Sequence, residues 1–244
     1  MAIENGDFIR MNYTGRFEST GDVYETTIEE IAREAGTYSE KSVYKPIPAI
    51  IGQTQLFPEI TEAILESDVG DKMTVKVPCE HAFGERRSEL VELVSVKELR
   101  KNGINPVQGA YVQYKGMEAR ILTVNGGRVK LDYNHPYAGR DIIADVEVCE
   151  KIDGDDNKIK AIVERYYPNQ SFDFDKTTVE WNDNVLNIKL DPAARFDQDT
   201  YMNITLARFN IARVIYTAFE NITKVNFVDE FEKPEPKTEE ESEE

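Results

Sequence analysis

The sequence predicts an α+β protein of two or three small domains, and three observations support this class. Short runs alternate apolar and polar residues, as half-buried strands do. Two pairs of such runs flank Asn125-Gly126-Gly127 and Asn182-Asp183-Asn184, which are turn signals of β-hairpins. Other stretches repeat apolar residues at the spacing of an amphipathic helix. A chain of 244 residues is long enough for more than one such unit.

The first 85 residues are predicted to form strands separated by short helices. Residues 8–13 alternate and form a strand, which Thr14-Gly15 should turn. Thr27 is followed by Glu30 at the third helical position, which indicates a capping box, and Pro58 suits the first turn of a helix. The predicted elements are strand 8–13, helix 27–36, strand 46–52, helix 58–67 and strand 72–77.

Residues 86–133 form a distinct block. A short helix is predicted at 96–100 and a loop at 102–106. Residues 119–124 and 128–133 are the arms of the hairpin around Asn125-Gly126-Gly127. A further strand over 141–148 places Ile142, Ala144, Val146 and Val148 on one face.

The pattern changes after Cys149, which predicts a separate C-terminal α+β domain over residues 151–230. A helix at 158–167 is followed by a hairpin with arms 177–181 and 185–190, and by a final strand at 224–228. The intervening helix, residues 197–219, carries an apolar stripe of Ile204, Ala207, Ile211, Ile215 and Phe219. Residues 231–244 form an acidic tail with two prolines, and we expect it to be disordered.

Composition excludes several function classes. The net charge is −17, whereas nucleic-acid binding needs clustered Lys and Arg, so we expect no nucleic-acid partner. No stretch approaches eighteen apolar residues, and residues 1–10 lack the pattern of a signal peptide, so we expect no membrane partner and a cytoplasmic location. No phosphate loop or other cofactor signature is present, so we expect no cofactor.

A metal site is also not expected. Cys79 and Cys149 lie seventy residues apart in sequence and form neither a CxxC pair nor a zinc-type spacing, which favours two free thiols in a reducing compartment. There are two histidines. His135 precedes Pro136 and could bind a metal, but a lone His in a turn more often makes a structural hydrogen bond.

Four short motifs occur in a fixed order: Asn12-Tyr13-Thr14-Gly15, then residues 51–60 (IGQTQLFPEI), then His81-Ala82-Phe83-Gly84-Glu85, then residues 134–139 (NHPYAG). Together they resemble the FKBP family of peptidyl-prolyl cis/trans isomerases. The long gap between the last two motifs is similar to the inserted chaperone module of the SlyD-like branch. The extra C-terminal domain is similar to that of long-chain archaeal FKBPs.

The resemblance implies a fold and a domain arrangement. Residues 1–85 and 133–150 would form an antiparallel half-barrel around a short helix, with residues 86–132 inserted as a small β-rich module. It implies a peptidyl-prolyl isomerase that also acts as a folding chaperone, and unfolded or nascent polypeptides containing proline as its partners. The site residues implied by the matching positions are Tyr13, Tyr24, Glu25, Leu56, Phe57, Ile60, Phe83 and Ala144.

This residue set suits the chemistry. Rotation about a prolyl bond is opposed by about 18–20 kcal/mol of amide resonance, and an apolar, water-poor site lowers that barrier without a nucleophile or a metal. Four positions depart from the family. Phe83 replaces a tyrosine and lacks its hydroxyl, Ile60 and Ala144 replace aromatic residues, and Glu25 replaces an aspartate. We therefore expect modest activity, and the alternative function is a holdase with a vestigial isomerase site.

The insert is expected to bind unfolded chains through apolar side chains, some of which must instead form its own core. The candidates for client binding are Leu90, Val91, Val94, Val96, Val112, Tyr114, Met117 and Ile121, with Leu99 and Leu122 as further possibilities. The C-terminal domain carries no recognisable chemistry. The exposed side of its long helix could support a homodimer or bind clients.

Overall fold

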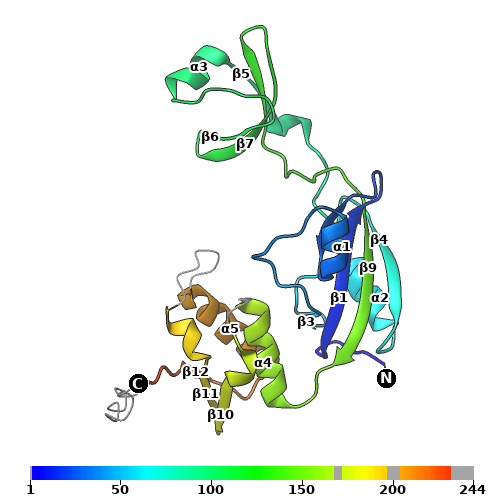
Figure 1. Ribbon diagram of the computed structural model, residues 1–244, viewed down its shortest axis with the longest axis vertical. Helices are drawn as coiled ribbons and strands as arrows, with labels where there is room; N and C mark the ends of the chain where they lie inside the picture. Colours follow the sequence, from blue (N-terminus) through cyan, green and yellow to red (C-terminus); the bar gives the residue numbers. More distant parts are fainter. Residues whose placement is uncertain (1, 168–171, 197–203, 232–244) are drawn as a thin grey trace, which may run out of the picture.

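The computed structural model describes residues 2–167, 172–196 and 204–231, which form three β-sheets, each with its own packed core. Figure 1 shows the first body beside the N-terminus, a second raised above it on a thin neck, and a third at the C-terminal end. Helices pack beside largely antiparallel sheets, so the predicted α+β class is confirmed.

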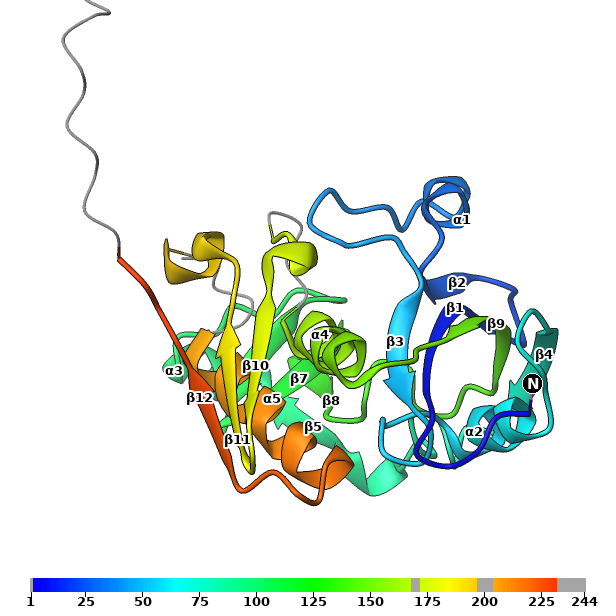
Figure 2. The same ribbon diagram turned by 90° about the horizontal axis from the view of Figure 1, so that it is seen from below.

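The first sheet has the strand order β2-β1-β9-β4, and β3 pairs with the remaining part of β1. All of its pairings are antiparallel. It curves around the helix α2 (Pro58–Leu65), while α1 (Glu29–Glu34) lies beside β2 (Figure 2). The strands are β1 (Phe8–Phe17), β2 (Val23–Thr26), β3 (Ile47–Ile50), β4 (Lys72–Val77) and β9 (Ile142–Lys151).

Two local predictions in this body are wrong. Thr14-Gly15 does not turn the chain, because β1 runs through both residues to Phe17. Gly15 instead allows a close approach: a Cβ at this position would overlap the side chains of Tyr13 and Tyr24. Thr27 does not cap α1. Its hydroxyl donates to Asn12 Oδ1 (3.1 Å) and accepts from the Tyr13 N–H (2.9 Å), so cross-strand bonds take the place of a cap.

The insert forms a four-stranded antiparallel sheet in the order β5-β8-β7-β6. The predicted hairpin is present as β7 (Met117–Asn125) and β8 (Arg128–Asp132). Gly126 and Gly127 have φ of 56° and 74°, a region in which side chains are strained. The other elements are a 3-10 turn (Ser88–Leu90), β5 (Val91–Ser95), α3 (Val96–Lys101) and β6 (Tyr111–Tyr114). The sequence analysis did not identify β5 or β6.

The C-terminal body packs two helices against a three-stranded sheet in the order β10-β11-β12, in which β11 and β12 are parallel. Ile159, Leu186 and Ile211 are fully buried in its core. Its elements are α4 (Asp155–Tyr166), β10 (Thr178–Asn182), β11 (Val185–Lys189), α5 (Ile204–Ala218) and β12 (Lys224–Phe227), with 3-10 turns at Phe174–Lys176 and Pro192–Phe196. Residues 197–203 of the predicted long helix, and 232–244 of the predicted tail, lie outside the described residues.

The C-terminal body is docked on the first body. Phe8 and Ile50, from β1 and β3, belong to the same buried cluster as the core of the C-terminal body, and the rings of Phe8 and Phe219 lie 6.4 Å apart. The buried carboxylate of Glu164 on α4 pairs with Arg10 (2.7 Å) and Lys45 (2.6 Å) of the first body. Apolar packing and a charge cluster together fix this junction.

Candidate active site

A cluster of aromatic rings lies where the first body meets the neck, and Phe83 is at its centre. The Phe83 ring contacts four others, with centroid distances of 5.0 Å to His135, 5.1 Å to Tyr137, 5.5 Å to Tyr24 and 6.0 Å to Phe57. Four of these five side chains, His135 excepted, are half-buried, so their faces are packed but still reach solvent. The cluster combines strand β2, the start of α2 and the loops at 78–84 and 134–139.

Tyr13 and Tyr24 join their hydroxyl groups in a hydrogen bond above Gly15. Burial, the bond to Tyr24 and the charge of Glu25 raise the pKa of Tyr13, and burial raises that of Tyr24 despite the lowering effect of the Tyr13 bond. Both phenols therefore stay protonated near neutral pH. One of them donates to the other, which leaves the second proton available to an acceptor outside the pair.

Glu25 does not take part in that bonded pair. It lies on β2 opposite Gly15 and is exposed, whereas its charge still acts on both tyrosines. The Tyr24 hydroxyl already bonds the Tyr13 hydroxyl, and the side chain of Glu25 is one methylene longer than that of an aspartate. The hydroxyl groups of Tyr13 and Tyr24 are therefore the bonded polar groups here, and the Glu25 carboxylate lies outside the pair.

The remaining predicted site residues divide into two groups. Leu56 and Phe57 are half-buried and pack beside the rings, so they reach the surface. Ile60 and Ala144 are 1% and 0% exposed and belong to the core beneath. In this conformation neither can contact a substrate directly, and they shape the site only through the rings that pack on them.

The loop at 78–84 holds Phe83 in place. The N–H groups of His81 and Ala82 each donate to the Pro78 carbonyl at 3.0 Å, and the Gly84 N–H donates to the Cys79 carbonyl at 2.7 Å. His81 Nδ1 is hydrogen-bonded to Glu59 of α2, next to Pro58. The bond and the charge of Glu59 raise the pKa of His81. The loop is therefore tied to the helix that follows Phe57.

The neck between the first body and the insert is a bonded network around Asp132, which is 5% exposed. Asp132 pairs with Arg86 and accepts from the backbone N–H (3.1 Å) and side-chain amide (2.7 Å) of Asn134. Asn134 also exchanges two bonds of 2.9 Å with the Arg87 backbone. Below it, the Gly139 N–H donates to the Gly84 carbonyl at 2.8 Å. The outgoing and returning chains are thus joined side by side.

The insert residues predicted to bind clients do not share one surface. Val94, Tyr114 and Ile121 are 4%, 4% and 0% exposed, as is Leu99 at 0%, so these positions are corrected to core positions around α3. Met117 is 54% exposed. The half-buried candidates are Leu90, Val91, Val96, Val112 and Leu122.

The sequence analysis missed residues on both surfaces. Besides Met117, the large exposed apolar side chains of the insert are Leu93 (58%), Val107 (58%), Tyr111 (50%) and Val124 (39%). In the aromatic cluster it missed Tyr137, although the NHPYAG motif pointed to that loop. His135 makes a structural bond as expected, because its Nδ1 accepts from the Tyr137 N–H at 3.3 Å. Among the described residues, no group of His, Cys, Asp or Glu could hold a metal ion.

Comparison with known proteins gives three family matches in chain order. Residues 1–94 match FKBP-type peptidyl-prolyl cis-trans isomerase, residues 92–137 match FKBP26, IF domain, and residues 155–232 match FKBP26_C-terminal. The short-type peptidyl-prolyl cis-trans isomerase of Methanocaldococcus jannaschii is 31% identical over 146 residues, which are 60% of this chain and 92% of that protein. The chain belongs to the FKBP family.

Bacterial relatives agree with this membership. The FKBP-type 16 kDa peptidyl-prolyl cis-trans isomerase of Escherichia coli K12 is 30% identical over 122 residues, covering 47% of this FKBP and 81% of the relative. A probable enzyme of the same description from Pseudomonas fluorescens is 23% identical over 137 residues, covering 53% and 90%. This FKBP is therefore a peptidyl-prolyl cis-trans isomerase, and its resemblance to archaeal FKBPs with an inserted module and an extra C-terminal domain is confirmed.

Its partners are polypeptides, as the isomerase and inserted domains imply. In the part of the chain that the structure describes, no helix combines the length and apolar character needed to cross a bilayer.

Proposed function

We propose that prolyl isomerisation takes place on the aromatic cluster around Phe83. A proline ring seated against Tyr24, Phe57, Phe83 and Tyr137 would lose water from its amide. The planar, charge-separated form of the amide then loses solvation relative to the twisted form, which lowers the rotation barrier. The free proton of the tyrosine pair supports this assignment, because it can donate to a carbonyl of the twisted chain.

The insert would hold unfolded chains by two means. Strand β6 pairs with β7 alone among the described strands, so its outer edge offers backbone groups to an added strand. Tyr111 on that strand and Met117 at the adjoining turn are both at least 50% exposed, so they can bury apolar side chains of a client.

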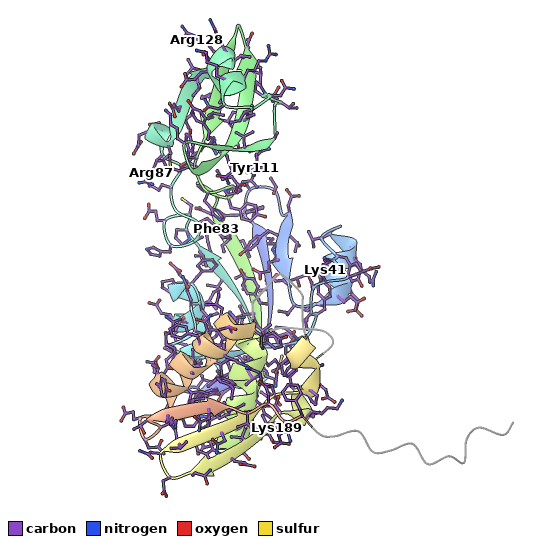
Figure 3. All side chains as sticks on the ribbon, turned by 90° about the vertical axis from the view of Figure 1, so that its left-hand side faces the viewer. Lys41, Phe83, Arg87, Tyr111, Arg128 and Lys189 are labelled. Atoms are coloured by element: carbon purple, nitrogen blue, oxygen red, sulfur yellow. The ribbon has the colours of Figure 1, made fainter. Side chains whose placement is uncertain are left out.

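The observation that carries this coupled function is the place of the insert relative to the cluster. In Figure 3, Tyr111 lies at the lower end of the insert and Phe83 lies just below it. The hydrogen bond between Gly139 and Gly84 joins the two linking chains at the cluster itself. A client held on the insert would meet the isomerase site at a concentration of roughly the millimolar range, which can offset weak binding at the cluster.

Proline-limited refolding tests the coupling. The full-length chain is compared with a variant in which residues 86–132 are replaced by a short loop, and a proline tetrapeptide serves as a second substrate. We expect the full chain to accelerate refolding, the variant to lose that acceleration, and both to turn over the tetrapeptide. Equal acceleration of refolding by both proteins would contradict the coupling.

The alternative is a holdase with a vestigial site, and specific features favour it. Phe83 has no hydroxyl, and Glu25 is exposed rather than bonded to Tyr13. This alternative predicts suppression of aggregation without acceleration of refolding or of the tetrapeptide reaction. The two functions are therefore separated by the same experiment.

We also propose a cytoplasmic, reducing compartment, which is consistent with the free thiols of Cys79 and Cys149.

We further propose a homodimer formed through α5. Leu206, Phe209 and Tyr216 are 54%, 65% and 44% exposed and lie on one side of the helix. An exposed apolar stripe of this kind suits a two-fold, self-complementary contact. Light scattering should give a dimeric mass for the wild type and a monomeric mass for Phe209→Glu. A monomeric wild type would contradict the dimer.

A further inference from the structure

The charge of the insert is opposite to that of the rest of the chain. Residues 86–132 contain nine Lys and Arg and five Asp and Glu, a net charge of +4. The remaining residues therefore carry −21 of the total of −17. A small positive module on a strongly acidic protein is not needed for solubility, since the acidic body already provides it.

Four of the nine positive charges, Lys97, Arg100, Lys101 and Arg128, lie at or next to a cleft at the free tip of the insert. The cleft is shallow and open to solvent, has a volume of about 560 Å³ and is lined by Val96, Lys97, Arg100, Lys101 and Gly127. The Val96 N–H donates to the Gly127 carbonyl at 2.9 Å, which fixes α3 against the hairpin turn. Arg128 follows directly, and Figure 3 shows it at the end of the insert farthest from the neck.

These cations have no anionic partner within the insert. Lys97, Arg100, Lys101 and Arg128 are exposed, and none forms an ion pair in the part of the chain that the structure describes. Glu98, on the same helix, accepts from the Tyr114 hydroxyl instead. Lys97 and Lys101 are four residues apart on one helix, so their repulsion slightly destabilises α3. A bound anion would relieve that repulsion.

We propose that this cleft binds acidic segments of unfolded client chains, so that the insert selects clients by charge as well as by apolar content. The proposal rests on the chaperone function proposed above. The cleft is lined by the apolar side chain of Val96 as well as by Lys97, Arg100 and Lys101, which suits a segment that mixes carboxylates with aliphatic side chains. Nucleic acid fits less well, because no aromatic residue lines the cleft for base stacking and the acidic body would repel a long polyanion.

Peptide binding to the full-length protein provides the test. Two labelled peptides of equal length alternate Val with either Glu or Gln, and fluorescence anisotropy gives their affinities at low and high salt. We expect the Glu peptide to bind about fivefold more tightly at low salt, with the preference shrinking as salt screens the charges. Replacing Lys97, Arg100 and Lys101 together by Glu should bring the ratio of affinities to one or below.

A charge-matched control separates the cleft from the overall field. The control replaces Lys41, Arg213 and Lys224 by Glu, three exposed cations outside the insert, and so changes the net charge by the same amount. It should retain the preference for the Glu peptide. If the cleft variant unfolds, judged by circular dichroism, the corresponding triple Gln variant replaces it and should still remove most of the preference.

Several outcomes would overturn the inference. Equal affinity of the wild type for both peptides, or equal loss in the cleft and control variants, excludes a specific acidic site. If a single-stranded RNA oligonucleotide binds the cleft more tightly than the Glu peptide does, the ligand of the cleft is nucleic acid and not an acidic client segment. Failure to bind either peptide would contradict the proposed chaperone function itself. Binding of both peptides without preference would contradict only the selection by charge.

Discussion

The proposed isomerase site around Phe83 and the insert present apolar side chains to solvent in different ways. Around Phe83, the half-buried rings pack against one another, and backbone hydrogen bonds fix the loop that carries Phe83. On the insert, Leu93, Tyr111 and Met117 project singly from a thin sheet. The first arrangement suits the single proline ring of the proposed reaction, whereas the second would adapt to many client sequences under the proposed chaperone function. The comparison indicates how one chain can combine a reaction at one chemical group with the proposed holding of many different sequences.

The largest effect should separate core from surface within the insert. Ile121→Ala removes a fully buried side chain and should lower the free energy of unfolding of the insert by about 2–5 kcal/mol. Met117→Ala removes an exposed one and should change it by less than about 0.5 kcal/mol. Hydrogen exchange of the insert measures the first quantity, and client binding should weaken in both variants. Equal stability of the two variants would contradict the burial pattern.

A smaller effect should follow from loosening the neck. Asp132→Asn removes the buried carboxylate that pairs with Arg86, a charge-assisted bond of about 1.5–3 kcal/mol. We expect refolding of a proline-limited protein to be accelerated several-fold less, because the insert no longer holds one orientation over the cluster. Turnover of a tetrapeptide, measured alongside, should be unchanged. A parallel loss of both activities would place the effect in the isomerase body instead.

Restoring a hydroxyl at the centre of the cluster should have a modest effect. Phe83→Tyr adds a donor that can bond a substrate carbonyl, worth on the order of 1 kcal/mol or about fivefold in kcat/KM. The tetrapeptide assay measures it, and Phe83→Leu is the matched variant that should reduce activity by removing the ring contacts. An unchanged rate in Phe83→Tyr would show that the missing hydroxyl does not limit catalysis.

The smallest effect should be a pH dependence that comes from the pair of His81 and Glu59. The bond to Glu59 raises the pKa of His81 above its ordinary value of 6.5. The stabilisation of the loop by this ion pair is therefore complete below pH 6.5 and is lost as the pH rises through the raised pKa. We expect kcat/KM for a tetrapeptide to decline slightly over this range as Phe83 loosens, and His81→Gln to show a flat profile. His81→Lys, which keeps the charge, should retain the low-pH activity. A wild-type profile as flat as that of His81→Gln would exclude the pair.

The sequence predicted the half-barrel and the members of the candidate site because short motifs tie residue identity to position. The family resemblance that those motifs carry places Tyr13, Phe57 and Phe83 at one site, and in the structure Phe57 and Tyr24 contact Phe83 while Tyr13 is bonded to Tyr24. Tyr137 could not be placed there, because a single aromatic residue in a turn has no periodic pattern. The close approach of Tyr13 and Tyr24 to Gly15 could not be predicted either. A single glycine in the sequence does not show whether it makes room for a neighbouring ring or turns the chain.

The insert shows why burial is harder to predict than strand pairing. Alternation separates two faces of a strand but does not say which face meets α3. Tyr111 and Tyr114 lie on the same short strand, and one is 50% exposed while the other is 4% exposed. The prediction that Thr27 caps a helix is wrong for a related reason. Its local capping propensity is outweighed by two cross-strand hydrogen bonds that depend on the tertiary fold.

The position of β9 has a consequence for the order in which the protein can mature during synthesis. This strand lies between β1 and β4 in the first sheet, yet it is translated only after the whole insert. The insert builds its sheet from contiguous sequence, so it can fold while the isomerase sheet still lacks its central strand. A nascent copy would thus carry a finished insert before its catalytic body closes. Under the proposed chaperone function, the insert would shield the unpaired edges of β1 and β4 of the same chain until residue 151 leaves the ribosome.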